Sequence, residues 1–144
     1  MKISDLHIAV AERLAVVGQR YTDKRRVIMD ALGSAGKPLS TPELVAAGLP
    51  QSSVYRNLAV LESAGVVRRV ITEDEFARFE LTEDLSRHHH HLICSRCGRV
   101  EDVTVPDDLE AVMDTMLDRL GRRSGFAQVS HRLDLIGICQ DCSG

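Results

Sequence analysis

All four cysteines of the chain fall into two pairs, each with two residues between its thiols. The pairs are Cys94 with Cys97 and Cys139 with Cys142. Two intervening residues let both thiolates of a pair reach one ion, and two pairs complete the tetrahedral sulfur site that zinc prefers. A redox dithiol needs only one pair, and a reducing cytosol disfavours disulfides. The cysteines therefore predict a structural zinc site that bridges the 41 residues between the pairs.

A run of four histidines, residues 88–91, lies just before the first cysteine pair. In a strand, side chains alternate between faces, so His89 and His91 would share one side and His88 and His90 the other. Histidines two residues apart lie about 6.6 Å apart along a strand, within reach of one metal ion. The run therefore predicts two separate half-sites. The candidate partners that complete them are Glu80, Asp102, Glu110 and His131.

The composition sets the class of protein. The chain has 144 residues, of which 44% are hydrophobic, so it can bury a core and is not disordered. It contains no run of 18 apolar residues that could span a membrane, and acidic residues interrupt the N-terminal segment where a signal peptide would be apolar. We expect a soluble, cytoplasmic protein.

The net charge of −3 conceals an asymmetry along the chain. Residues 1–70 carry a net charge of +4, whereas residues 71–144 carry −7 and five of the six histidines. A nucleic-acid reader joined to a cation-binding module would have this distribution, and chance unevenness is the alternative.

The first half has the pattern of a helix-turn-helix. Apolar residues recur at helical spacing over residues 6–17 and 27–32. Ser40 and Glu43 form a capping box that starts a short third helix, which stops at Gly48. A short helix, a glycine turn and a second amphipathic helix make this DNA-binding motif.

The helix after the glycine turn is the predicted recognition helix. We expect Ser52 or Ser53 to cap it and Gly65 to end it. Two stretches rich in β-branched or aromatic residues follow, at 66–72 and 76–81, and predict a hairpin. The first module is therefore expected to be a winged helix.

The second half is expected to form a small α/β unit. Strands are predicted at residues 88–94, 99–105 and 128–138, with a helix that Pro106 opens. So small a unit leaves a sheet edge and a helix face uncovered, so we expect it to dimerise. The predicted α+β organisation is a winged-helix DNA-binding domain at 1–82, a hinge at 83–87 and a metal-binding dimerisation domain at 88–144.

Polar residues on the predicted recognition helix could read DNA. Arg56 could bond a guanine edge or a phosphate, and Tyr55 could pack on a thymine methyl group. A basic cluster at the start of the second helix suits phosphate contacts, although solvated helix faces are the alternative. One such motif covers a half-site, so we expect a homodimer on palindromic double-stranded DNA. The candidate contacts are Arg20, Lys24, Arg25, Ser52, Ser53, Tyr55, Arg56 and Asn57.

Four segments together carry a family signature. They are FELT at 79–82, HHHHLICSRCGRV at 88–100, SHRLDLIGICQDC at 130–142 and SSVYRNLAVLESAGVV at 52–67. These segments resemble the Fur family of metal-dependent bacterial repressors, and the resemblance covers the chain from about Arg20 onward. It implies an N-terminal winged helix, a C-terminal dimerisation domain and a structural zinc on the four cysteines.

The resemblance also implies two further metal sites. It assigns Glu80, His89 and His91 to a sensing site between the domains, with Asp102 as a further candidate ligand. It assigns His88, His90, Glu110 and His131 to a second site in the dimerisation domain. Both sets agree with the alternation expected of the histidine run.

Some positions depart from the family pattern. Many members have a sensing histidine where this chain has Pro38, and zinc-sensing members often have Asp and Cys where it has Arg68 and Thr82. The segment from Glu80 to the histidine run is also longer here. His7 is a spare donor in the first half, although a lone histidine is commonly just a surface residue.

The sensed metal is predicted to be zinc, with Fe(II) as the alternative and manganese as a further option. Nickel and peroxide sensing are also left open. A histidine at position 90 is similar to zinc sensors, whereas Glu80 is similar to iron sensors. A zinc buffer or metallochaperone would explain the second half but not the winged helix. The chain has no HExxH, Walker A or nucleophile-elbow motif, so an enzyme is not expected.

Overall fold

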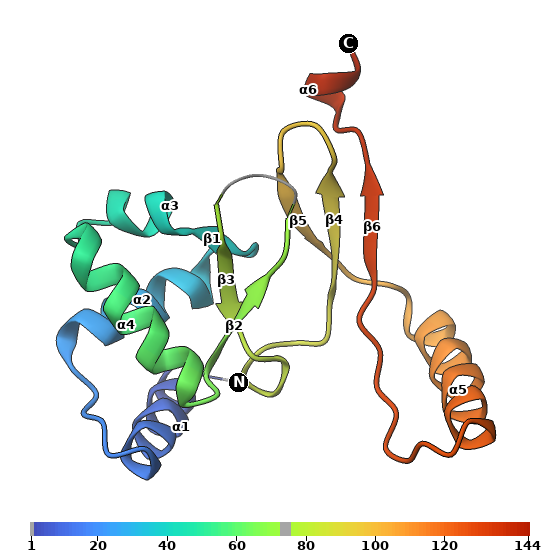
Figure 1. Cartoon of the computed structure of the whole chain (residues 1–144), viewed down its shortest axis with the longest axis horizontal. Helices are drawn as coiled ribbons and strands as arrows, with labels where there is room; N and C mark the ends of the chain where they lie inside the picture. The colour runs from blue at the N-terminus through green and yellow to red at the C-terminus, as the bar shows by residue number, and fades with distance from the viewer. Residues whose placement is uncertain (1, 73–75) are drawn as a thin grey trace.

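The computed structural model describes residues 2–72 and 76–144 and contains two three-stranded sheets (Figure 1). The strand order is β1-β3-β2 in the first sheet and β5-β4-β6 in the second. Helices α1 to α4 gather around the first sheet, and α5 lies beyond the second (Figure 1). The α+β prediction is confirmed.

Four helices make up most of the first half. They are α1 (Ile3–Val16), α2 (Asp23–Ser34), α3 (Thr41–Ala46) and α4 (Gln51–Ser63). The predicted capping box is present, since the Ser40 hydroxyl accepts the Glu43 amide and the Glu43 carboxylate accepts the Ser40 amide. Gly65, at φ 73°, ends the recognition helix α4 as expected.

The prediction that a serine caps α4 is wrong. Pro50, with φ −58° and ψ 139°, is the N-cap residue, and no side chain caps this end. Because Pro50 starts the helix earlier than expected, Ser52 and Ser53 lie inside its first turn. Their hydroxyls are therefore not used to cap the helix.

One core joins α1, α2, α4 and the first sheet. Leu14, Ile28, Leu58 and Leu61 are all buried, with Phe79 of the sheet packed among them. Each such side chain contributes about 1.5–3 kcal/mol by leaving water. The core therefore holds the recognition helix α4 and the wing in one rigid body.

The wing consists of β1 (Leu39–Ser40), β2 (Val67–Val70) and β3 (Arg78–Leu81). The expected hairpin is present with shorter strands, and its tip, residues 73–75, lies outside the described residues. β1 was not expected, because two residues before a capping box give no periodic signal. In the hairpin register Arg68 lies opposite Glu80.

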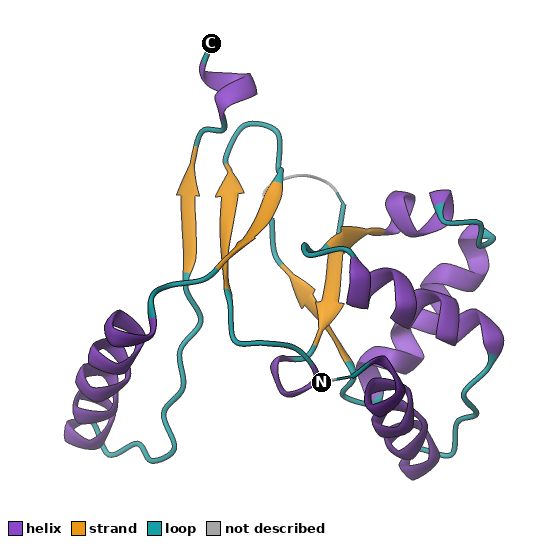
Figure 2. Cartoon of the chain, turned by 180° about the vertical axis from the view of Figure 1, so that it is seen from behind, coloured by secondary structure: helices purple, strands orange, loops and turns teal. Residues whose placement is uncertain are grey.

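The second sheet follows a short 3-10 helix, η1 (Glu83–Leu85). Its central strand β4 (His90–Cys94) pairs antiparallel with β5 (Val100–Val103) and parallel with β6 (Asp134–Gly137) (Figure 2). The last predicted strand starts late, at Asp134, and the positive φ of Gln128, 55°, excludes that residue from a strand. His131 therefore lies in the loop before β6 and not on a strand as expected.

Two more helices complete the chain, α5 (Asp107–Arg123) and α6 (Gln140–Ser143). No residue of α5 is buried, and the helix extends away from the second sheet, which it meets through Glu110 (Figure 1). Its apolar side chains, Leu109, Val112, Met116 and Leu120, are each at least half exposed. The expected uncovered helix face is thus present. Within the described residues, no helix combines the length and apolarity that crossing a membrane requires.

The segment between the two sheets is anchored to the first half. Leu85 of η1 is buried in the first core, and Asp84 beside it forms an ion pair with Arg13 of α1. The predicted hinge thus begins as an extension of the winged helix.

Candidate metal centres and DNA-facing surface

The four cysteines come together at one end of the second sheet and are all free thiols. Their sulfur atoms, the cysteine cluster, all lie within 4.8 Å of one another. The Sγ atoms of Cys97 and Cys139 are 3.8 Å apart. Zinc–sulfur bonds of about 2.3 Å in a tetrahedron place sulfur atoms about 3.8 Å apart, so the arrangement fits zinc.

Backbone amides prepare one thiol of this cluster for a cation. The Cys139 amide donates to the Cys94 Sγ atom at 3.3 Å. Together with the Cys97 amide it lowers the pKa of the Cys94 thiol to about 6. Hydrogen bonding with Cys139 and Cys97 instead raises the pKa of Cys142 to about 12. These backbone hydrogen bonds therefore favour the thiolate form of Cys94, which is the form that binds metal.

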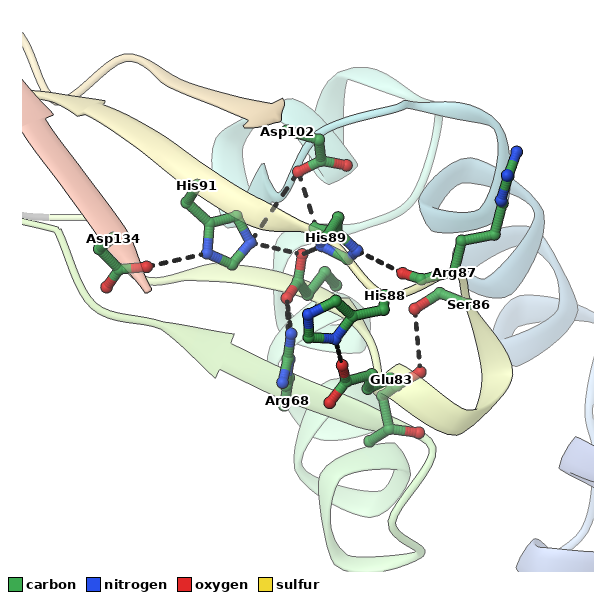
Figure 3. A network of polar contacts seen from close by, with 11 residues as sticks. Arg68, Glu83, Ser86, Arg87, His88, His89, His91, Asp102 and Asp134 are labelled. Atoms are coloured by element: carbon green, nitrogen blue, oxygen red, sulfur yellow. Dashed lines mark hydrogen bonds and ion pairs between the residues drawn. The ribbon is translucent and has the colours of Figure 1, made fainter. Parts of the chain in front are cut away.

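Two histidines and two carboxylates meet between the sheets, and we call them the inter-sheet cluster. The Nε2 atoms of His89 and His91 each lie 2.9 Å from the same Oε2 atom of Glu80 (Figure 3). Asp102 Oδ1 lies 3.7 and 3.9 Å from these nitrogens. Glu80 comes from β3, whereas the other three belong to β4, β5 or the segment entering β4. The cluster therefore spans both sheets.

The far nitrogens of both histidines are already bonded. His89 Nδ1 donates to the Arg87 carbonyl at 2.7 Å, and His91 Nδ1 donates to Asp134 at 3.2 Å (Figure 3). Such outer bonds fix each ring and direct its Nε2 atom at the cluster. Between each Nε2 atom and the Glu80 oxygen there is a place for one proton, which makes a hydrogen bond, or for a cation that replaces it. The inter-sheet cluster therefore fits a metal ion.

Charges in the inter-sheet cluster shift its pKa values. Burial alone would raise the pKa of Glu80, but hydrogen bonds from His91, His89 and Arg68 outweigh it and lower the pKa to about 2. His91 is also partly desolvated, yet Glu80 and Asp134 raise its pKa. Burial raises the pKa of Asp102. The cluster thus presents at least one full negative charge.

The remaining histidines form a three-histidine cluster on the other side of the run. The Nε2 atoms of His88 and His131 lie 3.3 and 3.1 Å from Glu110 Oε2, and His90 Nε2 contacts Oε1. His131 Nε2 and Glu110 Oε2 are buried without a hydrogen bond. Such orphaned polar atoms are costly unless a ligand satisfies them. This cluster also fits a metal ion, with all its residues from the second half.

The structure thus brings together all three predicted ligand sets. Three contacts were not foreseen: Asp134 with His91, Glu83 with His88 and Asp114 with His131. The spare donor His7 joins none of the clusters found among the described residues. It bonds Tyr21 and Asp30 inside the winged helix instead.

The predicted DNA-facing residues separate into two groups. Arg20, Lys24, Ser52, Tyr55 and Arg56 are exposed, and Ser53 is half-buried with its hydroxyl 3.3 Å from Lys24 Nζ. These six remain available to a duplex.

The expected exposure of Asn57 and Arg25 is wrong, because both are buried. Arg25 Nε donates to Asn57 Oδ1 at 2.9 Å, and Arg25 Nη1 donates to the Arg20 carbonyl at 2.6 Å. The first bond ties α2 to α4, and the second ties α2 to the segment that precedes it. Arg25 and Asn57 therefore position the recognition helix and do not present themselves to DNA.

A winged helix joined to a small sheet with three ligand clusters defines a metal-responsive DNA-binding regulator. Residues 16–136 match the ferric uptake regulator family, and the chain belongs to that family. Members of the family bind DNA and act as dimers.

Several known proteins are similar to this chain. The peroxide-responsive repressor PerR of Staphylococcus epidermidis is 28% identical over 137 residues, covering 90% of this chain and 85% of that protein. The ferric uptake regulator Fur of Helicobacter pylori has a TM-score of 0.77 at 20% identity, covering 100% and 95% of the two chains. A zinc-bound manganese uptake regulator has a TM-score of 0.62 at 32% identity, covering 90% and 98%. The relatives thus differ in the signal for which they are named.

Proposed function

We propose that this protein is a transcriptional repressor whose affinity for DNA depends on a divalent cation bound by the inter-sheet cluster. The observation that carries the proposal is the convergence of Glu80 from β3 with His89 and His91 from the second sheet. A cation bound there would be shared by the wing and the dimerisation domain. Its occupancy would therefore set how the two are oriented.

The residues act by selecting one orientation. A bound cation would take the place of the protons through which His89 and His91 bond Glu80. Glu80 moves with the winged helix, whereas His89, His91 and Asp102 move with the second sheet, so all four meet only in one arrangement. Cation binding can favour that arrangement only by being tighter there. In a dimer, the favoured arrangement sets the spacing of two recognition helices against a palindromic duplex.

Zinc is the proposed regulatory metal. The inter-sheet cluster offers two nitrogens and two carboxylates, four donors in all, which suits the four-coordinate preference of zinc. The 32% identical manganese uptake regulator with zinc bound supports this choice. Fe(II) and manganese, which also accept nitrogen and oxygen donors, are the alternatives. The cysteine cluster is proposed to hold structural zinc and the three-histidine cluster a second ion.

The partners follow from the same proposal. The exposed Tyr55 and Arg56 on α4 are placed to contact base edges, and Arg20 and Lys24 to contact phosphates. The bare apolar face of α5 would be covered by a second copy in a cytoplasmic homodimer. A zinc-buffering protein would use the clusters but would have no use for the exposed recognition helix.

The proposal is tested with a duplex selected from random sequence by the zinc-loaded protein. Binding of that duplex is titrated with zinc, Fe(II) or manganese against a chelator. His89→Ala with His91→Ala should remain a folded dimer and lose the metal dependence. The matched pair His88→Ala with His90→Ala should bind fewer ions but keep the dependence. Unchanged metal dependence in the first pair would refute the proposal.

A further inference from the structure

The two carboxylate oxygens of Glu80 have different partners. Its Oε2 atom faces both histidines of the inter-sheet cluster at 2.9 Å. Its Oε1 atom accepts a hydrogen bond from Arg68 Nε at 2.8 Å and forms an ion pair with Arg68 Nη2 at 2.7 Å. The Oε1 atom of Glu80 is therefore already bonded to Arg68, and only Oε2 faces the histidines.

The Arg68–Glu80 pair is built into the fold. The two residues are opposite each other in the β2–β3 register, and their side chains are only 18% and 7% exposed. The contact is charge-assisted, involves two guanidinium nitrogens and is largely shielded from water. It therefore holds the Glu80 carboxylate in one orientation. The next residue provides a contrast, because Arg69 pairs with Glu62 at 58% and 37% exposure and does not contact the cluster.

The oxygen that remains decides how many donors the cluster can offer. A carboxylate can bind a metal through one oxygen or both. With Oε1 held by Arg68, Glu80 can give only one. Metals that prefer six ligands, such as manganese and Fe(II), would gain from the second oxygen, whereas four-coordinate zinc would not.

We infer that Arg68 is a specificity-determining residue of the inter-sheet cluster, because it restricts Glu80 to a one-oxygen ligand and so favours zinc over manganese. This inference rests on the proposed metal site at that cluster. Arg68 does not itself bind the ion. It is a positioning residue that acts through Glu80, and it lies on the wing strand β2, so the choice of metal is made by the DNA-binding half.

The test compares Arg68→Met with Arg69→Met in the full chain. Both remove one positive charge from β2, but only the first releases Glu80. The cysteine cluster is kept zinc-loaded, and both chains carry His88→Ala with His90→Ala, which leaves the three-histidine cluster only Glu110 and His131. Chelator competition then gives the zinc and manganese affinities. Loss of an outer partner changes metal affinity about 10–100-fold, and we expect the zinc-to-manganese ratio to fall about tenfold in Arg68→Met only.

Cobalt(II) provides a second readout of ligand number, because its visible bands are intense in four-coordinate sites and weak in six-coordinate ones. Arg68→Met should weaken these bands, and Arg69→Met should not. An unchanged ratio and spectrum in Arg68→Met would overturn the inference, and so would an equal change in Arg69→Met, which would show a bulk charge effect.

Two further chains complete the test. Arg68→Lys keeps the positive charge but not the planar guanidinium that contacts Oε1 through two nitrogens. Glu80 keeps a charged partner, so the variant should fold. The zinc-to-manganese affinity ratio should fall as in Arg68→Met, but by less. If its zinc-to-manganese ratio equals that of the chain with Arg68 intact, the guanidinium geometry has no role and the inference fails. His89→Ala with His91→Ala should abolish the cobalt bands. If those bands persist, the proposed site itself is wrong, which is a different outcome from an intact site that is insensitive to Arg68.

Discussion

The cysteine cluster and the inter-sheet cluster each offer four ligands, but they connect different parts of the chain. All four cysteines lie at one end of the second sheet, so an ion there joins segments of a single domain. The inter-sheet cluster takes Glu80 from β3 of the wing and its other three ligands from the second half. Under the proposed function, the origin of the ligands is what separates a structural ion from a regulatory one.

Removing one cysteine should have the largest effect. Cys94→Ser takes away the thiolate that the Cys139 amide prepares. Binding of structural zinc contributes about 10–16 kcal/mol in small zinc-dependent folds, so the second half should unfold and the dimer dissociate. Circular dichroism and gel filtration measure both, and chelator-stripped parent protein should show the same losses. A folded, dimeric Cys94→Ser chain would show that the cysteines are not a structural site.

Substitutions of two carboxylates can distinguish a cation that links the wing to the second sheet from one that is only bound at the inter-sheet cluster. Glu80→Gln removes the one inter-sheet ligand that belongs to the wing, whereas Asp102→Asn removes the same charge from the second sheet. Either change should weaken metal binding about 10–100-fold. At saturating metal, however, Glu80→Gln should no longer strengthen DNA binding, and Asp102→Asn still should. Fluorescence anisotropy with a labelled duplex measures this, and equal behaviour of the two variants would contradict the bridging role.

The smallest effect is expected at the start of the hinge. Asp84→Asn removes the ion pair with Arg13 that holds η1 on α1. The pair is exposed, so the loss in unfolding free energy should be at most about 1 kcal/mol. Arg13 lowers the pKa of Asp84 from 3.8, so the pair stabilises the fold above that pH and is lost as the pH falls below it. Urea unfolding should therefore separate variant and parent at pH 7 but not in strong acid.

Local rules predict the pairing of the cysteines and the division of the histidine run, whereas the resemblance to the family assigned the carboxylates and His131 to their sites. Two-residue spacing pairs the cysteines, and strand alternation divides the histidine run even though only His90 and His91 lie within β4. Asp134 could not be assigned to His91 in this way, because that contact depends on the parallel pairing of β4 with β6. Such pairing is a tertiary feature with no signal in either strand alone.

The DNA-facing residues show the opposite case, in which a local rule was available. Asn57 lies three residues after Val54 and four before Leu61, both buried in α4. Helical periodicity therefore places it on the inner face, where a polar side chain needs a partner. Arg25 is that partner. Arg25 was predicted to contact DNA because of its charge, and charge alone does not reveal that a neighbouring residue already bonds the side chain.

The central claim is that ion and DNA bind cooperatively through the inter-sheet cluster. Linkage requires each to strengthen the other by the same factor. The most direct measurement is the zinc affinity of that cluster, by chelator competition, with and without the selected duplex in a chain whose cysteine cluster stays loaded. The account predicts that the duplex tightens zinc binding by the factor with which zinc tightens duplex binding. Equal zinc affinity in both conditions would contradict it.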